Sequence, residues 1–369
     1  MTPLLLMVRT LGHGGTERQV AQLAKSLDRT AFEPHIGCFV NEGFRAQELA
    51  AAGVPVLEMP MHGFLSLDSP RDLRLMGRYV RRHGIRLVHT FDYPMNVFGI
   101  PAARLLRVPV VLASQRSYRS LIPPKYHGML RLSDRLANGI VVNCEAIRRH
   151  LVEDYCVPER KIQVWHNALD TTQFHPAPRQ RPPELRDASL VIGSVSVLRA
   201  PKGLPVLLEA FARVRPSQPG LRLVLVGSGP DREALARQSR DLGIHDACLF
   251  RPSVPDVVPW LRAIDLFVLP SISEAFSNSL MEAMACGCCP IASRVGGNPE
   301  LIRHGETGLL FESRDSADLA AQLLAAIQNA PLRETLARNA AAWVAEQFAL
   351  PRSIGRIQQI YEHFLAAGH

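Results

Sequence analysis

Short apolar runs alternate with longer amphipathic stretches along most of the chain. The runs have the length of β-strands, and the stretches between them place apolar residues at the three- and four-residue spacing of a helix. Strands that are apolar throughout and alternate with helices are typical of a parallel sheet covered on both faces. The pattern therefore predicts an α/β fold. The runs that carry this prediction include LLLMV (4–8), IRLVHTF (85–91), VPVVLAS (108–114), LVIGSVSV (190–197), LRLVLVG (221–227) and LFVLPS (266–271).

The alternation is interrupted once, at a stretch rich in proline and arginine, HPAPRQRPPELRD, and then resumes. We therefore predict two Rossmann-like domains, residues 1–175 and 188–348, joined by a linker at 176–187. The last segment, 349–369, has helical spacing and is expected to pack back on the first domain. Ligands of such sheets bind beyond the carboxyl ends of the strands, which favours a site in a cleft between the two domains.

Composition narrows the classes of protein. The chain has 47% hydrophobic residues, and its apolar runs are far shorter than the roughly 18 to 20 residues of a membrane-spanning helix. The amino terminus has neither the charged start nor the long apolar stretch of a secretion signal. The seven cysteines lack disulfide or zinc spacing. These features predict a cytoplasmic protein with reduced thiols, and peripheral attachment at the inner face of the membrane is a further expectation.

The net charge of +8 lies mostly in the first half. Residues 1–178 carry 22 Lys and Arg against 15 Asp and Glu, whereas residues 179–369 carry 20 against 19, so the halves differ as +7 to +1. Arginine outnumbers lysine 38 to 4, and the guanidinium fork matches phosphate oxygens. A basic half indicates a phosphate-rich partner, such as nucleic acid, anionic lipid or a phosphorylated substrate, or else a solvated basic surface.

Two segments carry much of this basic charge. Residues 71–86 contain six arginines, and residues 116–137 add further Arg, Lys, Tyr and Leu. A helix over the first segment places five of its arginines on one face, away from its apolar positions. We therefore expect an anionic membrane surface as an additional partner, with a solvated basic face as the alternative. The five arginines are Arg71, Arg74, Arg78, Arg81 and Arg82.

Glycines and cations follow several of the predicted strands. Gly14 and Gly15 follow the first strand, while VLRAPKG brings Arg199 and Lys202 between a later strand and the next helix. Glycine lets a backbone approach a ligand closely, and cations beside free helix amides can hold a diphosphate. The first turn does not match the G-x-G-x-x-G dinucleotide pattern. Taken singly, each element is equally compatible with an ordinary strand-to-helix turn.

The stretch SISEAFSNSLMEAMACG places two carboxylates eight positions apart. Glu274 follows a predicted strand, and Glu282 lies within the next predicted helix. The small polar residues between them begin that helix, whose amino-terminal amides favour an anion. Carboxylates can accept hydrogen bonds from sugar hydroxyls while these amides face a phosphate. A capped helix with one solvated glutamate explains the spacing equally well.

Taken together, these motifs resemble the retaining glycosyltransferases of family 4, which have the two-domain GT-B fold. The resemblance covers nearly the whole chain. It implies an enzyme that moves a sugar from a nucleotide-sugar donor, with a UDP-sugar favoured over GDP-mannose, to a saccharide or lipid-linked acceptor in cell-surface glycan synthesis. It implies no nucleic-acid partner. The matching segments are the Glu274–Glu282 pair, LVGSGP, IDLFVLPS, GGNPELI, HGETGLLF, GGTERQV and HNALDTTQF.

The resemblance also implies roles for individual residues. Glu274 binds the hydroxyls of the donor sugar and Glu282 the ribose of the nucleotide, while Lys202 and Arg199 face the diphosphate. Gly14 and Gly15 approach the diphosphate or the acceptor. The backbone amides expected around the sugar and the phosphates belong to Ala275, Phe276, Ser277, Asn278 and Ser279.

Two positions depart from the family pattern. The family usually has an arginine five residues before the lysine, where this chain has Val197, and we expect Arg199 to take over. Many members carry a histidine after the strand that reads VPVV here, where it positions the acceptor or the sugar. The candidates for that acceptor-side role are His13, His89, Gln115 and Arg116.

No Asp-x-Asp sequence of the kind that holds a metal ion in many transferases occurs in the chain. We therefore expect metal independence and no cofactor, because the nucleotide sugar is a substrate. Three alternatives stay open. The first is a sugar-nucleotide epimerase on the same fold, and the second is a non-catalytic nucleotide-sugar-binding subunit. The third is a glycoside hydrolase, which also uses paired carboxylates but does not need a cationic diphosphate site.

Overall fold

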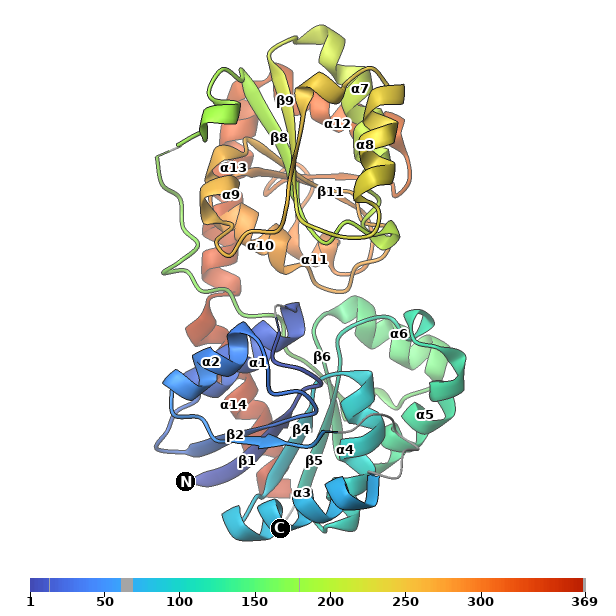
Figure 1. Ribbon diagram of the computed structural model, residues 1–369, viewed down its shortest axis with the longest axis vertical. Helices are drawn as coiled ribbons and strands as arrows, with labels where there is room; N and C mark the ends of the chain where they lie inside the picture. The colour runs from blue at the N-terminus through green and yellow to red at the C-terminus, as the bar shows by residue number, and fades with distance from the viewer. Residues whose placement is uncertain (13, 61–68, 179, 368–369) are drawn as a thin grey trace. The chain divides into compact units, whose positions relative to one another are not determined.

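The computed structural model describes residues 1–12, 14–60, 69–178 and 180–367. The chain divides into two compact units, each with a parallel sheet between layers of helices (Figure 1). Unit 1 combines Met1–Ala168 with Pro351–His369, and unit 2 is Leu169–Leu350. The α/β fold with two parallel Rossmann-like sheets is thereby confirmed. The division falls at Ala168, earlier than the expected domain end at residue 175, and the segment expected as a linker belongs to unit 2.

The sheet of unit 1 has seven strands in the order β3-β2-β1-β4-β5-β6-β7, and all neighbours are parallel. The order reverses between β1 and β4, as in doubly wound sheets, where strand ends next to the reversal form ligand sites. The strands are β1 (Thr2–Met7), β2 (Phe32–Cys38), β3 (Val56–Glu58), β4 (Leu87–Thr90), β5 (Val110–Gln115), β6 (Gly139–Val142) and β7 (Ile162–Val164).

The helices of unit 1 cover this sheet, and the last helix of the chain packs on it as well. Trp165 Nε1 donates to Ser353 O and Oγ at 3.0 and 2.8 Å, and the fully buried Tyr361 contacts Phe32 edge to face. These contacts hold the end of the chain on unit 1. The helices are α1 (Gly15–Ser26), α2 (Phe44–Ala51), α3 (Ser69–His83), α4 (Tyr93–Leu105), α5 (His127–Leu136), α6 (Glu145–Tyr155) and α14 (Leu350–Ala367).

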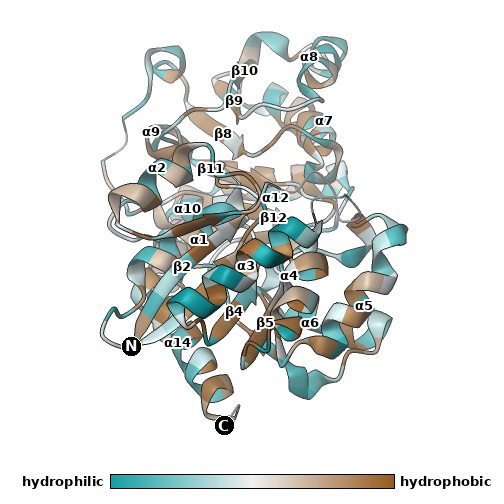
Figure 2. Cartoon of the chain, turned by 60° about the horizontal axis from the view of Figure 1, so that its bottom comes forward, coloured by the Kyte–Doolittle hydropathy of each residue, from teal (hydrophilic) through white to brown (hydrophobic). Residues whose placement is uncertain are grey.

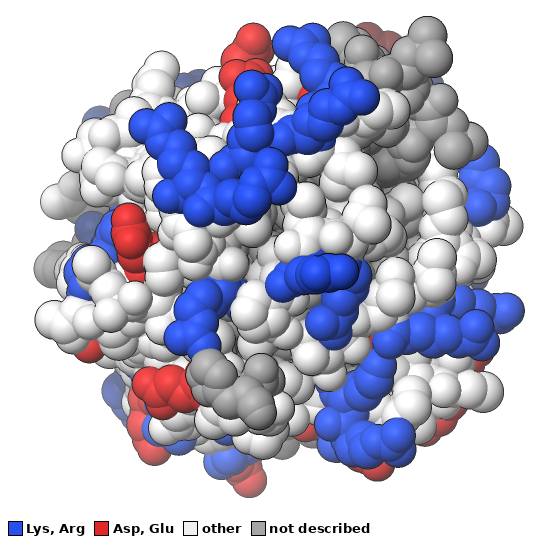
Figure 3. Space-filling view, turned by 90° about the horizontal axis from the view of Figure 1, so that it is seen from below, with Lys and Arg blue, Asp and Glu red and all other residues white. Residues whose placement is uncertain are grey.

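Helix α3 is the arginine-rich helix that the pattern predicts over 71–86. It ends at His83, because Gly84 adopts a positive φ of 60° and the Ile85 amide closes back on Val80 O. The five arginines that share one face of this helix are exposed, whereas Met76 and Val80 are buried. Hydrophilic colour follows α3 in Figure 2, and basic side chains outnumber acids in the view of Figure 3. The predicted amphipathic helix is therefore present, and its arginine face is exposed.

Unit 2 repeats the same strand order, β10-β9-β8-β11-β12-β13. The short strand β13 was not predicted from the sequence. It consists of only three apolar residues, LLF, which are too few to give a recognisable strand pattern. The strands are β8 (Leu190–Val195), β9 (Leu221–Val226), β10 (Cys248–Arg251), β11 (Leu266–Leu269), β12 (Cys289–Ser293) and β13 (Leu309–Phe311). The helices are α7 (Leu204–Val214), α8 (Arg232–Asp241), α9 (Val258–Ala263), α10 (Asn278–Ala285), α11 (Asn298–Leu301), α12 (Ser316–Gln328) and α13 (Ala330–Gln347).

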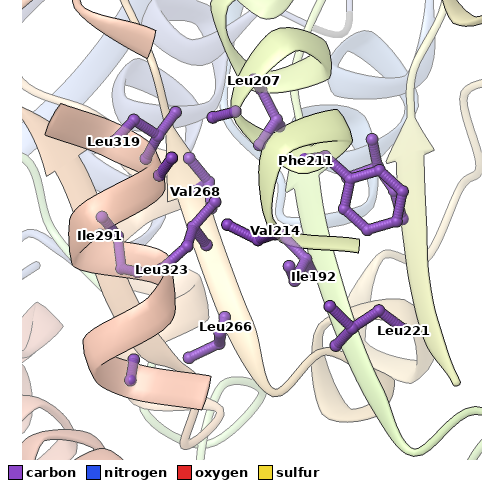
Figure 4. Close-up of a cluster of buried hydrophobic side chains, with 14 of the residues drawn as sticks. Ile192, Leu207, Phe211, Val214, Leu221, Leu266, Val268, Ile291, Leu319 and Leu323 are labelled. Atoms are coloured by element: carbon purple, nitrogen blue, oxygen red, sulfur yellow. The ribbon is translucent and has the colours of Figure 1, made fainter. Parts of the chain in front are cut away.

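One face of this sheet carries a continuous core. Leu207, Phe211 and Val214 of α7 meet Leu319 and Leu323 of α12 over the strands (Figure 4). Each of these five side chains is fully buried, which stabilises the unit by roughly 1.5 to 3 kcal/mol per side chain relative to exposure. This packing fixes the strands whose carboxyl ends carry the motif residues.

Within the described ranges, no helix is long and apolar enough to cross a membrane. All seven cysteines, each of which lies in a described range, are free thiols.

Candidate active site

Three loops leave the carboxyl ends of β8, β11 and β12, which are neighbours in the sheet of unit 2. Backbone hydrogen bonds tie these loops together. The Ile272 amide donates to Pro201 O at 2.9 Å, and the Gly297 amide donates to Ala275 O at 2.7 Å. The loops that follow the three strands therefore form one surface, although they are far apart in sequence.

Two glycines allow the loops to approach this closely. Gly203 has φ +63°, and a Cβ there would lie 2.0 Å from Pro270 O. Gly296 has φ +54°, and a Cβ there would lie 1.7 Å from Glu274 O. Both positions combine a backbone conformation that favours glycine with backbone contacts that exclude a side chain. Gly296 therefore packs directly against the backbone carbonyl of Glu274.

The centre of this surface is an ion pair. Lys202 Nζ donates to Glu274 Oε2 at 2.6 Å, and Ser271 Oγ donates to the same oxygen at 3.3 Å. The two charged side chains are only 16% and 14% exposed. Partial burial strengthens a charge-assisted hydrogen bond, so the carboxylate is held in place before any ligand binds.

Helix α10 begins four residues after Glu274. Ser277 is its N-cap and accepts a hydrogen bond from the Leu280 amide at 3.3 Å. Phe276 is buried with its ring 5.3 Å from that of Phe348, which anchors the approach to the helix. The first amides of a helix lack partners within the helix and favour an anion. Glu282 lies one turn further along α10 and is 4% exposed.

The other predicted donor residues lie in different settings. Ala275 is buried, and Asn278 and Ser279 form the partly buried first positions of α10. Arg199 is exposed and is the N-cap of a short 3-10 turn, Ala200–Lys202, so Lys202 ends this turn rather than starting α7. Of the predicted catalytic residues, the structure thus joins Lys202 directly to Glu274, while the Arg199 side chain makes no hydrogen bond or ion pair within the described residues.

The remaining donor candidates and the acceptor candidates belong to unit 1. Gly14 is the N-cap of α1 and Gly15 its first residue. His13 lies outside the described residues.

His89 is fully buried in β4, where its ring nitrogens lie 2.8 Å from Tyr361 Oη and 2.8 Å from Ser114 Oγ. Burial lowers the pKa of His89 well below its ordinary value. His89 is therefore held in the core of unit 1 through both ring nitrogens, and its acceptor-side role stays a prediction.

Gln115 and Arg116 lie at the carboxyl end of β5. The Gln115 side chain donates to Ser117 O at 2.6 Å and accepts a hydrogen bond from Arg119 Nε at 3.4 Å. Arg116 donates to Asn167 Oδ1, and its guanidinium lies 5.3 Å from the centre of the Trp165 ring. Burial lowers the pKa of Arg116 to about 10.

Sequence reasoning missed two polar residues at these strand ends. One is Ser271, which is fully buried and helps to hold Glu274. The other is Asp92, whose carboxylate accepts hydrogen bonds from the Arg9 and Met95 amides, each at 3.0 Å. Desolvation raises the pKa of Asp92 to about 6. Asp92 directly follows the apolar run IRLVHTF, so its position at a predicted strand end could have marked it as a candidate.

The described residues contain no group of three or more His, Cys, Asp or Glu side chains able to hold a metal ion. At the carboxyl end of β8, positive charge is carried by Lys202, with Arg199 near it in sequence.

The two-sheet architecture and the glutamate-bearing loop define a class of sugar-transferring enzymes, and comparison with known proteins agrees. The family model described as "Glycosyl transferases group 1" matches residues 178–343, and "Glycosyltransferase Family 4" matches residues 13–173. The chain is 31% identical over 303 residues to the N-acetyl-alpha-D-glucosaminyl L-malate synthase of Bacillus anthracis, covering 79% of each chain. The protein belongs to the glycosyltransferases of group 1, family 4, which confirms the resemblance and the assignment as an enzyme.

Other relatives extend over most of the chain. A D-inositol 3-phosphate glycosyltransferase of Streptomyces bingchenggensis is 30% identical, with 94% of this chain and 84% of that protein covered. Among solved structures, Anabaena HepE in complex with UDP and glucose has a TM-score of 0.83 at 22% identity. That alignment covers 98% of this chain and all of HepE. At this identity the likeness shows the shared fold.

Proposed function

We propose that this protein is a retaining glycosyltransferase that moves a sugar from a nucleotide-sugar donor to a saccharide or lipid-linked acceptor in cell-surface glycan synthesis. The observation that carries the donor half is the 2.6 Å contact of Lys202 Nζ with Glu274 Oε2, four residues before α10 begins. A cation, a carboxylate and helix amides along one strand edge suit a ligand that joins sugar hydroxyls to a diphosphate.

The proposed chemistry breaks the bond from the anomeric carbon of the sugar to the diphosphate oxygen. The new bond forms from that carbon to the acceptor hydroxyl, whose proton passes to the leaving diphosphate. Negative charge grows on the diphosphate in the transition state, where Lys202 and the first amides of α10 stabilise it. Glu274 accepts hydrogen bonds from the sugar hydroxyls, and Glu282 accepts them from the ribose. Arg199 supplies a second cation.

The proposal requires no metal ion, because Lys202 and Arg199 supply the positive charge that a divalent metal gives to other transferases. Activity should persist in excess EDTA after dialysis. Complete loss of activity that Mn²⁺ restores would contradict this part.

A UDP-sugar is the first choice of donor and GDP-mannose the second. The UDP and glucose bound by Anabaena HepE, which shares the fold, support this order. A turnover assay separates the proposed transfer from its rivals. Nucleotide release that requires an acceptor indicates transfer, and release without one indicates hydrolysis. An altered sugar without release indicates epimerisation, and binding without any turnover indicates a non-catalytic subunit. Only the first result supports the proposal.

The basic face of α3 supports an anionic membrane surface as a second partner, which would bring a lipid-linked acceptor within reach. Five exposed arginines share this face, and each basic residue near an anionic surface adds about 1 kcal/mol of binding free energy.

Vesicle co-sedimentation tests this partner. Replacing Arg74, Arg78 and Arg81 with Gln should weaken binding to anionic vesicles by about 100-fold, and high salt should do the same to the unchanged protein. The matched control replaces the exposed Arg232, Arg237 and Arg240 of α8, with the same loss of charge. Equal, negligible binding to anionic and neutral vesicles at low salt would remove the membrane from the proposal.

A further inference from the structure

Two arginines lie three residues apart on the loop that follows β5, and both stack on aromatic rings. Arg119 is 1% exposed, and its guanidinium lies 5.1 Å from the centre of the Tyr155 ring. Arg116 is partly buried, and its guanidinium lies 5.3 Å from the centre of the Trp165 ring. Both guanidinium groups thus lie over an aromatic ring, and their ionic partners can be compared.

The two guanidinium groups differ in their counter-ions. Arg119 forms a fork with Asp134, in which Nη1 and Nη2 each donate to a carboxylate oxygen at 2.7 Å. Arg116 donates to the neutral amide oxygen of Asn167. Among the described residues, no carboxylate lies within ion-pair distance of Arg116. Arg119 is therefore fully neutralised within the protein, whereas Arg116 is not.

A desolvated cation without a counter-ion is costly, and that cost is visible at Arg116. Burial lowers its pKa to about 10, and the ionisable groups whose charge would oppose this are Cys144 and Tyr361. Tyr361 stays protonated at neutral pH, because burial raises its pKa well above the ordinary value. A position that served packing alone would be better filled by an apolar side chain. The arginine therefore indicates a negative charge that the protein itself does not provide.

The place of Arg116 in the sheet suits a ligand. β5, β6 and β7 are adjacent and in register, with Gln115 opposite Val142 and Val142 opposite Val164. Arg116 follows β5 and reaches Asn167, beyond the end of β7. Asn143, directly after β6, has a buried Oδ1 that no hydrogen bond satisfies. The carboxyl ends of these three strands thus carry a guanidinium and an amide oxygen with unused capacity, at the edge where such sheets bind ligands.

We propose that Arg116 binds an anionic group of the acceptor, a phosphate or a carboxylate, and so selects charged acceptors over neutral ones. The inference rests on the proposed transferase function, whose acceptor it describes. The guanidinium fork takes two oxygens of the anion in the way that Arg119 takes those of Asp134. A hydroxyl of the same acceptor donates to Asn143 Oδ1.

Calorimetric titration with glycerol 3-phosphate and with glycerol tests the proposal. Every variant is made in the Lys202→Met, Arg199→Met background, which removes both cations proposed for the donor site. Arg116→Met should weaken glycerol 3-phosphate binding by about 10- to 100-fold and leave the weak binding of glycerol unchanged. Arg116→Lys, which keeps the charge but loses the fork, should fall between. The control Arg149→Gln removes an exposed arginine of α6 and should change nothing. Unaltered phosphate binding in Arg116→Met would overturn the proposal.

Thermal unfolding separates a binding role from a structural one. Arg116→Met should unfold at the wild-type temperature or above it, whereas Arg119→Met, which strands Asp134, should unfold well below it. A drop for Arg116→Met as large as that for Arg119→Met would mark Arg116 as structural and overturn the inference.

Two further arms identify the source of the anion and separate this inference from the proposed function. Arg116-dependent binding of glycerol 3-phosphate alone indicates a soluble acceptor, and Arg116-dependent binding of phosphatidic acid, dispersed in vesicles of zwitterionic lipid, indicates a lipid-linked one. If the wild-type protein turns over a nucleotide sugar but Arg116→Met binds phosphate normally, only this inference fails. If phosphate binding depends on Arg116 but no nucleotide sugar binds, only the proposed function fails.

Discussion

Lys202 in unit 2 and Arg116 in unit 1 both follow the carboxyl end of a parallel strand, yet their charges are balanced differently. Lys202 has a carboxylate partner at 2.6 Å, whereas Arg116 has an amide oxygen and an indole ring. Asp92, at the neighbouring strand end of unit 1, is also poorly compensated, and its pKa is raised to about 6. The comparison suggests that the unit 2 edge is pre-organised by its own ion pair, while the unit 1 edge is completed by its ligand.

The largest expected effect comes from breaking the ion pair of unit 2. Lys202→Ala should lower kcat by about 100- to 1000-fold with saturating donor, because it removes a donor aimed at the charge that grows on the diphosphate. Steady-state kinetics measures this. Arg199→Ala, which removes an exposed cation nearby, should cost less. A fall in kcat of less than about tenfold for Lys202→Ala would show that the lysine does not stabilise the transition state.

The pre-organised backbone of unit 2 gives the next effect. Gly296→Ala places a Cβ on Glu274 O and should lower the free energy of unfolding by about 3 kcal/mol. Gly243→Ala is the matched control, since Gly243 also has a positive φ, +67°, but open space around it. It should cost only about 1 kcal/mol. Urea unfolding measures both, and equal losses would show that the contact behind Glu274 is unimportant.

The two motif glutamates should differ in what they bind. Glu274→Gln should weaken the complete nucleotide sugar by about tenfold and leave the free nucleoside diphosphate almost unaffected. Glu282→Gln should weaken both ligands, because the ribose that we propose Glu282 binds is common to them. Calorimetry with each ligand makes the comparison. If Glu274→Gln weakens the free nucleotide as much as the donor, the assignment of the two acids is wrong.

A pH-dependent effect on stability is expected in unit 1. Because the folded-state pKa of Asp92, about 6, exceeds its unfolded value near 3.8, the folded state binds more protons between these values. Stability from this group is therefore complete below about pH 4 and declines as the pH rises towards 6, by up to about 1.4 kcal/mol per unit of pH. Asp92→Asn should flatten the stability profile over that window. An unchanged slope in urea unfolding between pH 4 and 6 would contradict the raised pKa.

The sequence predicts the fold well because its apolar runs are long and regular, and only β13 is too short to stand out. It also places Lys202 and Glu274 on strand exits, although their contact depends on the pairing of β8 with β11, which no local pattern specifies. His89 shows the converse problem. Its burial depends on Tyr361, 272 residues away in sequence, so no nearby residue marks it as part of the core. The missing counter-ion of Arg116 is likewise a property of tertiary structure alone.

A thermal-shift panel of nucleotides and nucleotide sugars tests whether the Lys202–Glu274 edge of unit 2 binds a nucleotide-sugar donor. A donor present at about 100 times its Kd should stabilise the native protein by about 2.7 kcal/mol and raise Tm accordingly. We expect such a shift for one nucleotide sugar, larger than for its free nucleotide, and its loss in the Lys202→Ala, Glu274→Gln double variant. No shift with any nucleotide sugar, or the same shift in the double variant, would contradict it.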